Sequence, residues 1–300
     1  VPEFWNYASF NNARGISGEP SVRLTSKYEI VKDQKIKASL GTYNETPQPQ
    51  GQAIDKNWGN TKLPAEKGSH YVVGYEWKIN DLVSADVQAY HNTQWDLART
   101  PSSVEIGAAA EAGTSLPKYL SNGKARMTGL EIMIKHDQSK RFFGWIAYSL
   151  SKSERWNFDE NKWALFGQDQ THNLQLIGSL RMRGLQEAGV RLRYVTGDPT
   201  TPILGTDYFD ATQRRYIAKY GPRNSDRMYP YVSLDLRYEK KHTYKLWQWS
   251  FYIDITHVEN LFGKGYKSPE TNSYIWNYDY TEKYVLSDIT RPAFGLKIDF

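Results

Sequence analysis

Apolar and polar residues alternate one by one along most of this chain. The segment LVSADVQAY, residues 82–90, places valine or alanine at every odd position, with polar residues or tyrosine between them. The same alternation recurs in NLQLIGSLR (173–181), YVSLDLRY (231–238), WQWSFYIDI (247–255) and the final RPAFGLKIDF (291–300). A period of two puts successive side chains on opposite faces of a β-strand, whereas a helix repeats about every 3.6 residues. The pattern therefore predicts an all-β chain.

The connections between the strands are as informative as the strands. The alternation predicts eleven long strands, near residues 20–30, 34–44, 67–79, 82–95, 124–136, 140–151, 170–183, 187–196, 227–240, 244–258 and 291–300. Short polar turns join them into hairpins near residues 31–33, 80–81, 137–140, 184–187 and 241–243. Long connections separate the hairpins, at residues 44–66, 96–123, 152–169 and 197–226. A further hairpin is expected at 273–286, in the last long loop before the final strand. This alternation is typical of an antiparallel transmembrane β-barrel, with short periplasmic turns and long external loops.

Hydropathy is compatible with such a barrel. The mean hydropathy is −0.68, and no apolar run is long enough for a membrane-spanning helix. Barrel strands alternate lipid-facing and lumen-facing residues, so their average is hydrophilic even though they cross a bilayer. A helical membrane protein is excluded, and a β-barrel in the bacterial outer membrane, in contact with its lipid, is favoured.

Aromatic residues, which make up 14% of the chain, fall near the strand ends. On the aliphatic face, rings near the short turns are those of Tyr28, Trp77, Phe142, Tyr238, Trp247 and Phe300, and rings toward the long loops are those of Tyr71, Tyr148 and Tyr194. Two such belts match the two interfaces of a bilayer. The alternative is the core of a soluble β-sandwich, which does not require rings to be sorted to strand ends.

Charge and reactive residues exclude several functions. The net charge of +5 comes from 38 basic residues mixed with 33 acidic ones, without the basic cluster that nucleic-acid binding needs. Cysteine is absent, and the six histidines lack metal-ligand spacing. Single carboxylates in GYEWK and GLEIM have no partner at catalytic spacing. We therefore expect no enzyme activity, no metal and no cofactor.

Several motifs resemble those of one family. RYVTGDPTTPI (193–203), VENLFGKGY (258–266) and the final RPAFGLKIDF stand in the order and spacing found in TonB-dependent outer-membrane transporters, and NGKARMTGLEIMIK (122–135) with GWIAYSLSKSER resembles a hairpin of their barrel. Gly263 and Ala293 depart from the residues usual in these motifs.

The resemblance implies a 22-stranded barrel filled by an N-terminal plug domain, with a preceding box that contacts TonB. Residues 1–300 would be the C-terminal portion of that barrel domain, without the plug and the first strands. A single-chain bacterial barrel has an even number of strands. Eleven strands that end on opposite sides of the membrane therefore predict further sequence before Val1.

The function implied is import of a bound siderophore, cobalamin, glycan or peptide, driven by the inner-membrane proton gradient. Two alternatives stay open: a passive porin with an unplugged lumen, and a transporter-like barrel that serves as a structural or secretion component of an envelope complex. In the family's pattern the terminal aromatic residue, here Phe300, is the signal for the barrel-assembly machinery.

Two sets of residues are candidates for substrate binding. On the predicted lumen face they are Arg181, Arg191, Arg193, Asp235, Arg237, Tyr252 and Asp254. On the long loops they are Trp156, Trp163, Tyr208, Phe209, Trp276 and Tyr278. The alternative for the first set is hydrogen bonding to the plug and to one another, because unpaired charges in a crowded lumen are costly. The alternative for the second set is packing of the loops against each other.

Overall fold

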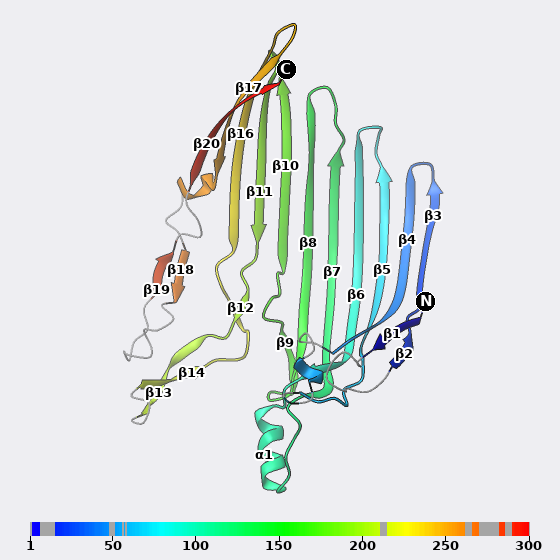
Figure 1. The fold of residues 1–300 in the computed structure, drawn as a ribbon, viewed down its shortest axis with the longest axis vertical. Coiled ribbons are helices and arrows are strands. Elements are labelled where there is room, and N and C mark those ends of the chain that lie inside the picture. Colours follow the sequence, from blue (N-terminus) through cyan, green and yellow to red (C-terminus); the bar gives the residue numbers. More distant parts are fainter. Residues whose placement is uncertain are drawn as a thin grey trace. The chain divides into compact units, whose positions relative to one another are not determined.

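Antiparallel strands dominate the structure, a computed structural model that describes residues 2–6, 16–47, 52–55, 57, 59–210, 215–261, 266–269, 282–285 and 290–299. The principal sheet follows the order of the chain, and Figure 1 shows its strands. They are β3 (Arg23–Val31), β4 (Gln34–Glu45), β5 (Glu66–Lys78), β6 (Val83–Arg99), β7 (Leu120–His136), β8 (Phe142–Asn157), β10 (His172–Met182), β11 (Gln186–Val195), β16 (Tyr231–Thr243), β17 (Gln248–Thr256) and β20 (Arg291–Asp299).

These strands confirm the prediction of an antiparallel sheet with eleven long strands. β3 pairs antiparallel with β4, and the pairings from β8 through β10, β11, β16 and β17 to β20 are also antiparallel. Most boundaries fall close to those predicted, but β6 and β8 continue into segments predicted as loops, to Arg99 and Asn157. β9 (Lys162–Leu165) extends this region by pairing with the end of β8.

Smaller elements lie in the other long connections. β12 (Pro199–Thr200) pairs with β15 (Asp226–Arg227), and β13 (Ile203–Asp210) with β14 (Arg215–Tyr220). The remaining elements are β1 (Pro2–Asn6), β2 (Ile16–Pro20), η2 (Gln52–Ile54), η3 (Val258–Leu261), β18 (Tyr266–Pro269) and β19 (Glu282–Val285). β19 falls within the hairpin predicted at 273–286 and pairs with β18; the rest of that segment lies outside the described residues.

Contacts divide the chain into two compact units. The first contains Val1–Tyr75, Gln88–Leu130 and Lys152–Phe166; the second contains Glu76–Val87, Glu131–Ser151 and Gly167–Phe300. The first unit has a small apolar core made by Ala53, Ile54, Leu63 and Tyr119. The Asn60 amide donates a hydrogen bond of 3.0 Å to the backbone oxygen of Tyr119 and so fixes the edge of this core.

The aliphatic face of the strands is exposed rather than buried. In β20 the alternate residues Phe294, Leu296 and Ile298 are 66%, 65% and 46% exposed. The same holds in strands with a neighbour on each side, where Val73 in β5, Ile146 in β8 and Leu180 in β10 are 59%, 43% and 46% exposed. A sandwich would bury these side chains in its core, whereas a membrane barrel presents them to lipid. The sandwich alternative is therefore wrong for these strands.

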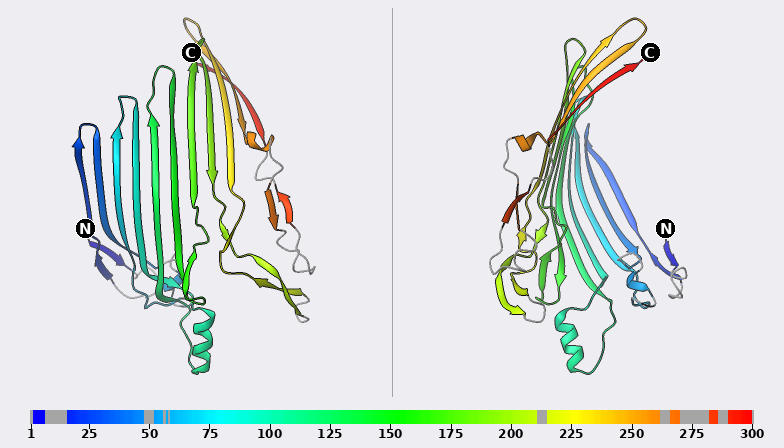
Figure 2. Two further views of the ribbon diagram at one scale, coloured as in Figure 1. Left: turned by 180° about the vertical axis from the view of Figure 1, so that it is seen from behind. Right: turned by 60° about the vertical axis from the view of Figure 1, so that its left-hand side comes forward.

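The helix α1 (Ser103–Glu111) was not predicted. The Ser102 hydroxyl accepts a hydrogen bond from the Glu105 backbone, and the Glu105 carboxylate accepts one from the Ser102 backbone, which completes a capping box. Asp159, from the segment between β8 and β9, accepts a further bond of 2.8 Å from the Ser103 backbone. Figure 2 shows α1 beyond the ends of β6 and β7, which it connects.

Arg99 fastens this helix to β6. Its guanidinium donates two hydrogen bonds to the Glu105 carboxylate, of 2.8 and 2.6 Å, and lies 3.5 Å from the ring centroid of Phe158. These bonds from Arg99, with the backbone bond from Ser102, lower the pKa of Glu105 to about 2. Of the helices in the described ranges, none has the length and apolar character needed to cross a bilayer.

Candidate functional site

The register of β10, β11, β16 and β17 gathers the predicted lumen residues on one face of the second unit. Arg191 stands opposite Asp235, and Arg237 opposite Asp254. Arg193 lies two residues beyond Arg191 on the same face, toward the long connection that follows β11. Figure 1 shows the four strands side by side. The predicted residues on these strands thus form one polar surface, as their spacing indicates.

Arg191 is held by Asp235. Its Nε and Nη2 atoms donate hydrogen bonds of 2.8 and 2.5 Å to Asp235 Oδ2. The second carboxylate oxygen, Oδ1, accepts bonds of 3.0 Å from the His257 backbone and 3.2 Å from the Ser233 hydroxyl. Asp235 therefore joins β11 and β16 to the residue that precedes η3. Both side chains are engaged within the protein, which supports a structural role for this pair.

Arg237 is similarly engaged. Its Nη1 atom donates a bond of 2.6 Å to Asp254, and its Nη2 atom donates one of 3.2 Å to Glu239. The guanidinium lies 4.4 Å from the ring centroid of Tyr252. That ring lies so close to Gly295 in β20 that a Cβ atom there would overlap it. Tyr252 thus supports Arg237 and covers a glycine of the neighbouring strand.

Arg193 differs from these two arginines. Its guanidinium lies over the ring of Tyr231, 5.5 Å from the centroid, and the side chain is exposed. Within the described ranges it has no carboxylate partner, whereas Arg181, Arg191 and Arg237 each form an ion pair. Among the predicted lumen arginines, it is the one whose charge is available to a ligand.

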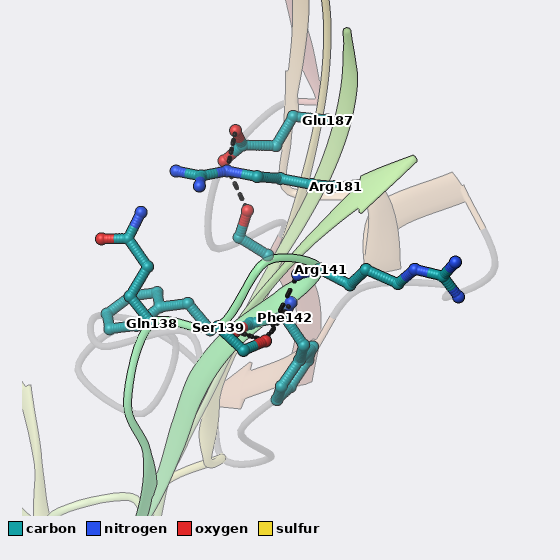
Figure 3. Close-up of a pocket in the computed structure, with 8 residues that line it drawn as sticks. Gln138, Ser139, Arg141, Phe142, Arg181 and Glu187 are labelled. Carbon is teal, nitrogen blue, oxygen red and sulfur yellow. Dashed lines mark hydrogen bonds and ion pairs between the residues drawn. The ribbon is translucent and has the colours of Figure 1, made fainter. Parts of the chain in front are cut away.

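Arg181 lies near the short turn between β10 and β11, beside a cavity of about 140 Å³. Its Nε atom is 3.5 Å from a carboxylate oxygen of Glu187, and the Ser179 hydroxyl donates a 2.5 Å bond to the other oxygen. In Figure 3 the side chains of Arg181 and Gln138 extend to one side, whereas Arg141 points away from them. Arg181 thus has its acidic partner, Glu187, in the wall of the same cavity.

The loop aromatics that the structure describes pack against one another. The rings of Trp156 in β8 and Trp163 in β9 meet edge to face at 5.4 Å. Arg126 lies 4.4 Å over the Trp163 ring and donates a 2.7 Å bond to Glu154. These contacts favour a packing role for both tryptophans.

For the other loop candidates the structure describes no side-chain contacts. Tyr208 and Phe209 lie in β13, where only the backbone is described. Trp276, Tyr278 and the terminal Phe300 lie outside the described residues.

One buried ion pair escaped the sequence-based prediction. Arg227 donates a 2.5 Å bond to the carboxylate of Asp169, whose side chain is 0% exposed. The two residues are 58 positions apart and carry no local pattern. A local signal is the glycine in TGDP, because a Cβ atom on Gly197 would overlap the backbone of Met228, the residue after Arg227.

The described ranges contain no metal-binding cluster. No group of three or more histidine or acidic side chains there is placed to hold a metal ion.

Comparison with known proteins decides the family. A family model described as TonB dependent receptor-like, beta-barrel matches residues 5–261. The chain belongs to this family. The resemblance drawn from the sequence motifs is therefore confirmed, as is the fold class: the chain is part of an antiparallel TonB-dependent receptor barrel, consistent with its C-terminal half. No curated protein gives a significant match.

Solved TonB-dependent receptor structures share the fold at low sequence identity. The ferric-catecholate import receptor Fiu of Escherichia coli K12 is 13% identical with a TM-score of 0.58, over 95% of this chain and 35% of that one. The pyoverdine receptor FpvA of Pseudomonas aeruginosa PAO1 is 15% identical with a TM-score of 0.61, over 95% and 38%. The ferric citrate transporter FecA is 10% identical with a TM-score of 0.60, over 94% and 38%. The chain thus spans well under half the length of these TonB-dependent receptors.

Proposed function

We propose that this chain forms part of the wall of an energised importer in the bacterial outer membrane. The aliphatic face of its strands would contact lipid, and the polar face would line the lumen. The remainder of the full-length protein would supply a plug domain and the segment that contacts TonB. The observation that carries the proposal is the match to the receptor family over residues 5–261, on a sheet with one exposed apolar face.

The first substrates to test are ferric chelates. Three of the structures that the chain resembles are named for ferric catecholate, pyoverdine and ferric citrate. Arg193 on the polar face forms no ion pair within the described part of the chain, and its charge supports an anionic substrate. Cobalamin, glycans and peptides remain further classes to be compared in the same assay.

Uptake of radioactive iron tests this proposal directly. Cells that express the full-length protein would receive ferric catecholate, ferric citrate or ferric pyoverdine, with and without TonB. We expect uptake of at least one chelate to fall to the level of a receptor deletion when TonB is removed. Undiminished uptake without TonB would instead indicate passive diffusion.

Two rival functions give different results. A passive porin would make liposomes that contain the purified protein swell in neutral sugars, because solutes would cross without energy. A structural or secretion component would produce neither swelling nor TonB-dependent uptake of any substrate class. An importer with its plug in place should give uptake without swelling.

Phe300 is proposed as the assembly signal of this barrel. Its deletion should lower the amount of protein inserted in the outer membrane without lowering the stability of the inserted fraction. Gel migration of outer-membrane fractions before and after boiling measures the inserted amount, and the temperature at which migration changes measures the stability. Wild-type amounts of inserted protein after the deletion would refute this role.

A further inference from the structure

A cavity of about 340 Å³ lies where the end of β11 meets the start of β16. Its wall includes Arg193 and Tyr231 from the polar face, together with Asp198, Met228 and Tyr229 from the long connection between these strands. A volume of this order is at the lower end of small-molecule sites. The cavity therefore has room for one charged group and an adjoining ring or short aliphatic chain.

Arg227 holds the segments around this cavity together. Its Nη1 atom donates bonds of 2.9 Å to the Asp169 backbone and 3.0 Å to the Gly197 backbone. Its Nη2 atom donates bonds of 2.5 Å to the Asp169 carboxylate and 2.6 Å to the Thr171 hydroxyl. One side chain thus connects the segment before β10, the turn after β11 and β15. We call Arg227, Asp169, Thr171 and Gly197 the Arg227 clamp.

Close backbone packing adds to the Arg227 clamp. A Cβ atom on Gly197 would overlap the backbone carbonyl groups of Met228 and Tyr229, so a larger residue would force these segments apart. The Met228 backbone also donates a 2.9 Å bond to the backbone oxygen of Asp198. The cavity is consequently formed before any ligand arrives, which reduces the entropy lost on binding.

The charges that face the cavity define its ligand. Arg193 lies over the Tyr231 ring, and it forms no ion pair with a carboxylate in the described part of the chain. A guanidinium without an ion-pair partner is suited to hydrogen bonding with a carboxylate or a similar oxyanion. Asp198 lines the same cavity and repels a second negative charge. The exposed surfaces of Met228 and Tyr231 are available to an apolar group.

We infer that this cavity binds an organic monoanion, with its anionic group on Arg193 and its apolar part against Tyr231 and Met228. The inference rests on the proposed function in that the bound group would belong to the imported substrate. It goes further because it assigns the contact with the ligand's anionic group to Arg193, and because it predicts that the cavity prefers a ligand with one negative charge to a ligand with two.

Benzoate, benzyl alcohol and phthalate are suitable probes, because they share one ring and carry one, zero and two negative charges. Their binding to the purified full-length protein would be measured by saturation-transfer difference NMR at neutral pH. We expect benzoate to bind at least about tenfold more tightly than benzyl alcohol, the difference that one charge-assisted hydrogen bond provides. Phthalate should bind more weakly than benzoate.

Variants assign this preference to Arg193. In R193Q the affinity for benzoate should fall to that for benzyl alcohol, and R193K should recover part of the difference. The matched control is R183Q, in the exposed turn between β10 and β11, which should leave both affinities unchanged within about twofold. Y231L should weaken both neutral and charged probes. Heat-modifiable gel migration would verify that each variant has folded.

Equal affinity of the wild-type protein for benzoate and benzyl alcohol would overturn the inference. So would an unchanged benzoate preference in both R193Q and R193K. The binding assay needs no TonB and no proton gradient, so its outcome is separate from that of the uptake assay. Passive uptake combined with an Arg193-dependent preference for benzoate would refute the importer and support the binding site. TonB-dependent uptake without that preference would support the importer and refute the binding site.

Discussion

At the scale of single residues, enclosure decides which charged pairs matter for stability. The Asp169 side chain is 0% exposed and its partner Arg227 is 25% exposed, whereas Arg191 and Arg237 are 64% and 44% exposed. Exposed pairs contribute about 0–1 kcal/mol, while removing one partner from a buried pair costs several times more. Breaking the Asp169–Arg227 pair of the Arg227 clamp should therefore lower the free energy of unfolding more than breaking an ion pair on the polar face.

The substitution D169N tests this difference. It leaves Arg227 without its charged partner and should lower the free energy of unfolding by about 3 kcal/mol, the lower bound for breaking a buried pair, since Arg227 keeps some solvent contact. The comparison is D254N, which should cost about 1 kcal/mol or less because its partner Arg237 also bonds Glu239. Urea unfolding of the full-length protein in lipid vesicles measures both. Equal costs would show that enclosure is not the deciding factor.

At the scale of the elements, α1 depends on contacts at its N-terminus rather than on packing of its apolar residues. Its apolar residues Val104 and Ile106 are 61% and 56% exposed, so packing contributes little. Stability comes instead from the capping box of Ser102 and Glu105, the Arg99 guanidinium and the distant Asp159. A helix this short is marginal on its own. Loss of the Glu105 charge should therefore loosen it.

The pKa of Glu105 sets the pH at which this happens. It is lowered from the usual 4.5 to about 2, so the stabilisation is fully present above 4.5 and disappears as the pH falls through about 2. Protection of the α1 amides against hydrogen exchange, referred to the intrinsic rate at each pH, should stay constant from pH 7 to 5 and decrease only in strong acid. E105Q should lose protection at every pH, unlike the control E111Q at the helix end. A wild-type loss of protection near pH 5 would contradict the bonding described for Arg99.

The difference between local patterns and long-range contacts explains which elements the sequence predicts. The strands were predictable because each carries its period of two within about ten residues. α1 was missed because SVEIGAAAE has no apolar periodicity and its cap from Asp159 comes from 56 residues away. The local signal that could have located it is the spacing of Ser102 and Glu105, which fits a capping box. Likewise, alternation places Arg191, Arg193 and Arg237 on one face. The register between strands then sets Arg191 opposite Asp235 but Arg193 opposite Ser233, so that of the three only Arg193 has no acidic partner among the residues that the structure describes. Long-range pairing of this kind leaves no local pattern.

At the scale of the whole molecule, the two faces of the strands differ in which one meets lipid. The exposed aliphatic residues of β10 and β20 and the polar residues of β11 and β16 separate by alternate positions. Charged residues near the middle of a bilayer cost about 2–4 kcal/mol each on the lipid side of a barrel. The polar face must therefore be the lumen side if the chain spans the membrane. This assignment underlies the importer and the Arg193 site alike.

Spin-label accessibility along β10 is the most direct measurement of that assignment. The chain contains no cysteine, so single cysteines introduced one at a time from Asn173 to Arg181 into the full-length protein would be labelled without interference from other thiols of this chain. In outer-membrane vesicles, collision with oxygen should be high at Leu174, Leu176 and Leu180 and low at Asn173, Gln175 and Ser179, a period of two that reflects lipid on one side. Uniform accessibility along the strand, or the opposite phase, would contradict a membrane-spanning barrel wall with this polar face toward its lumen.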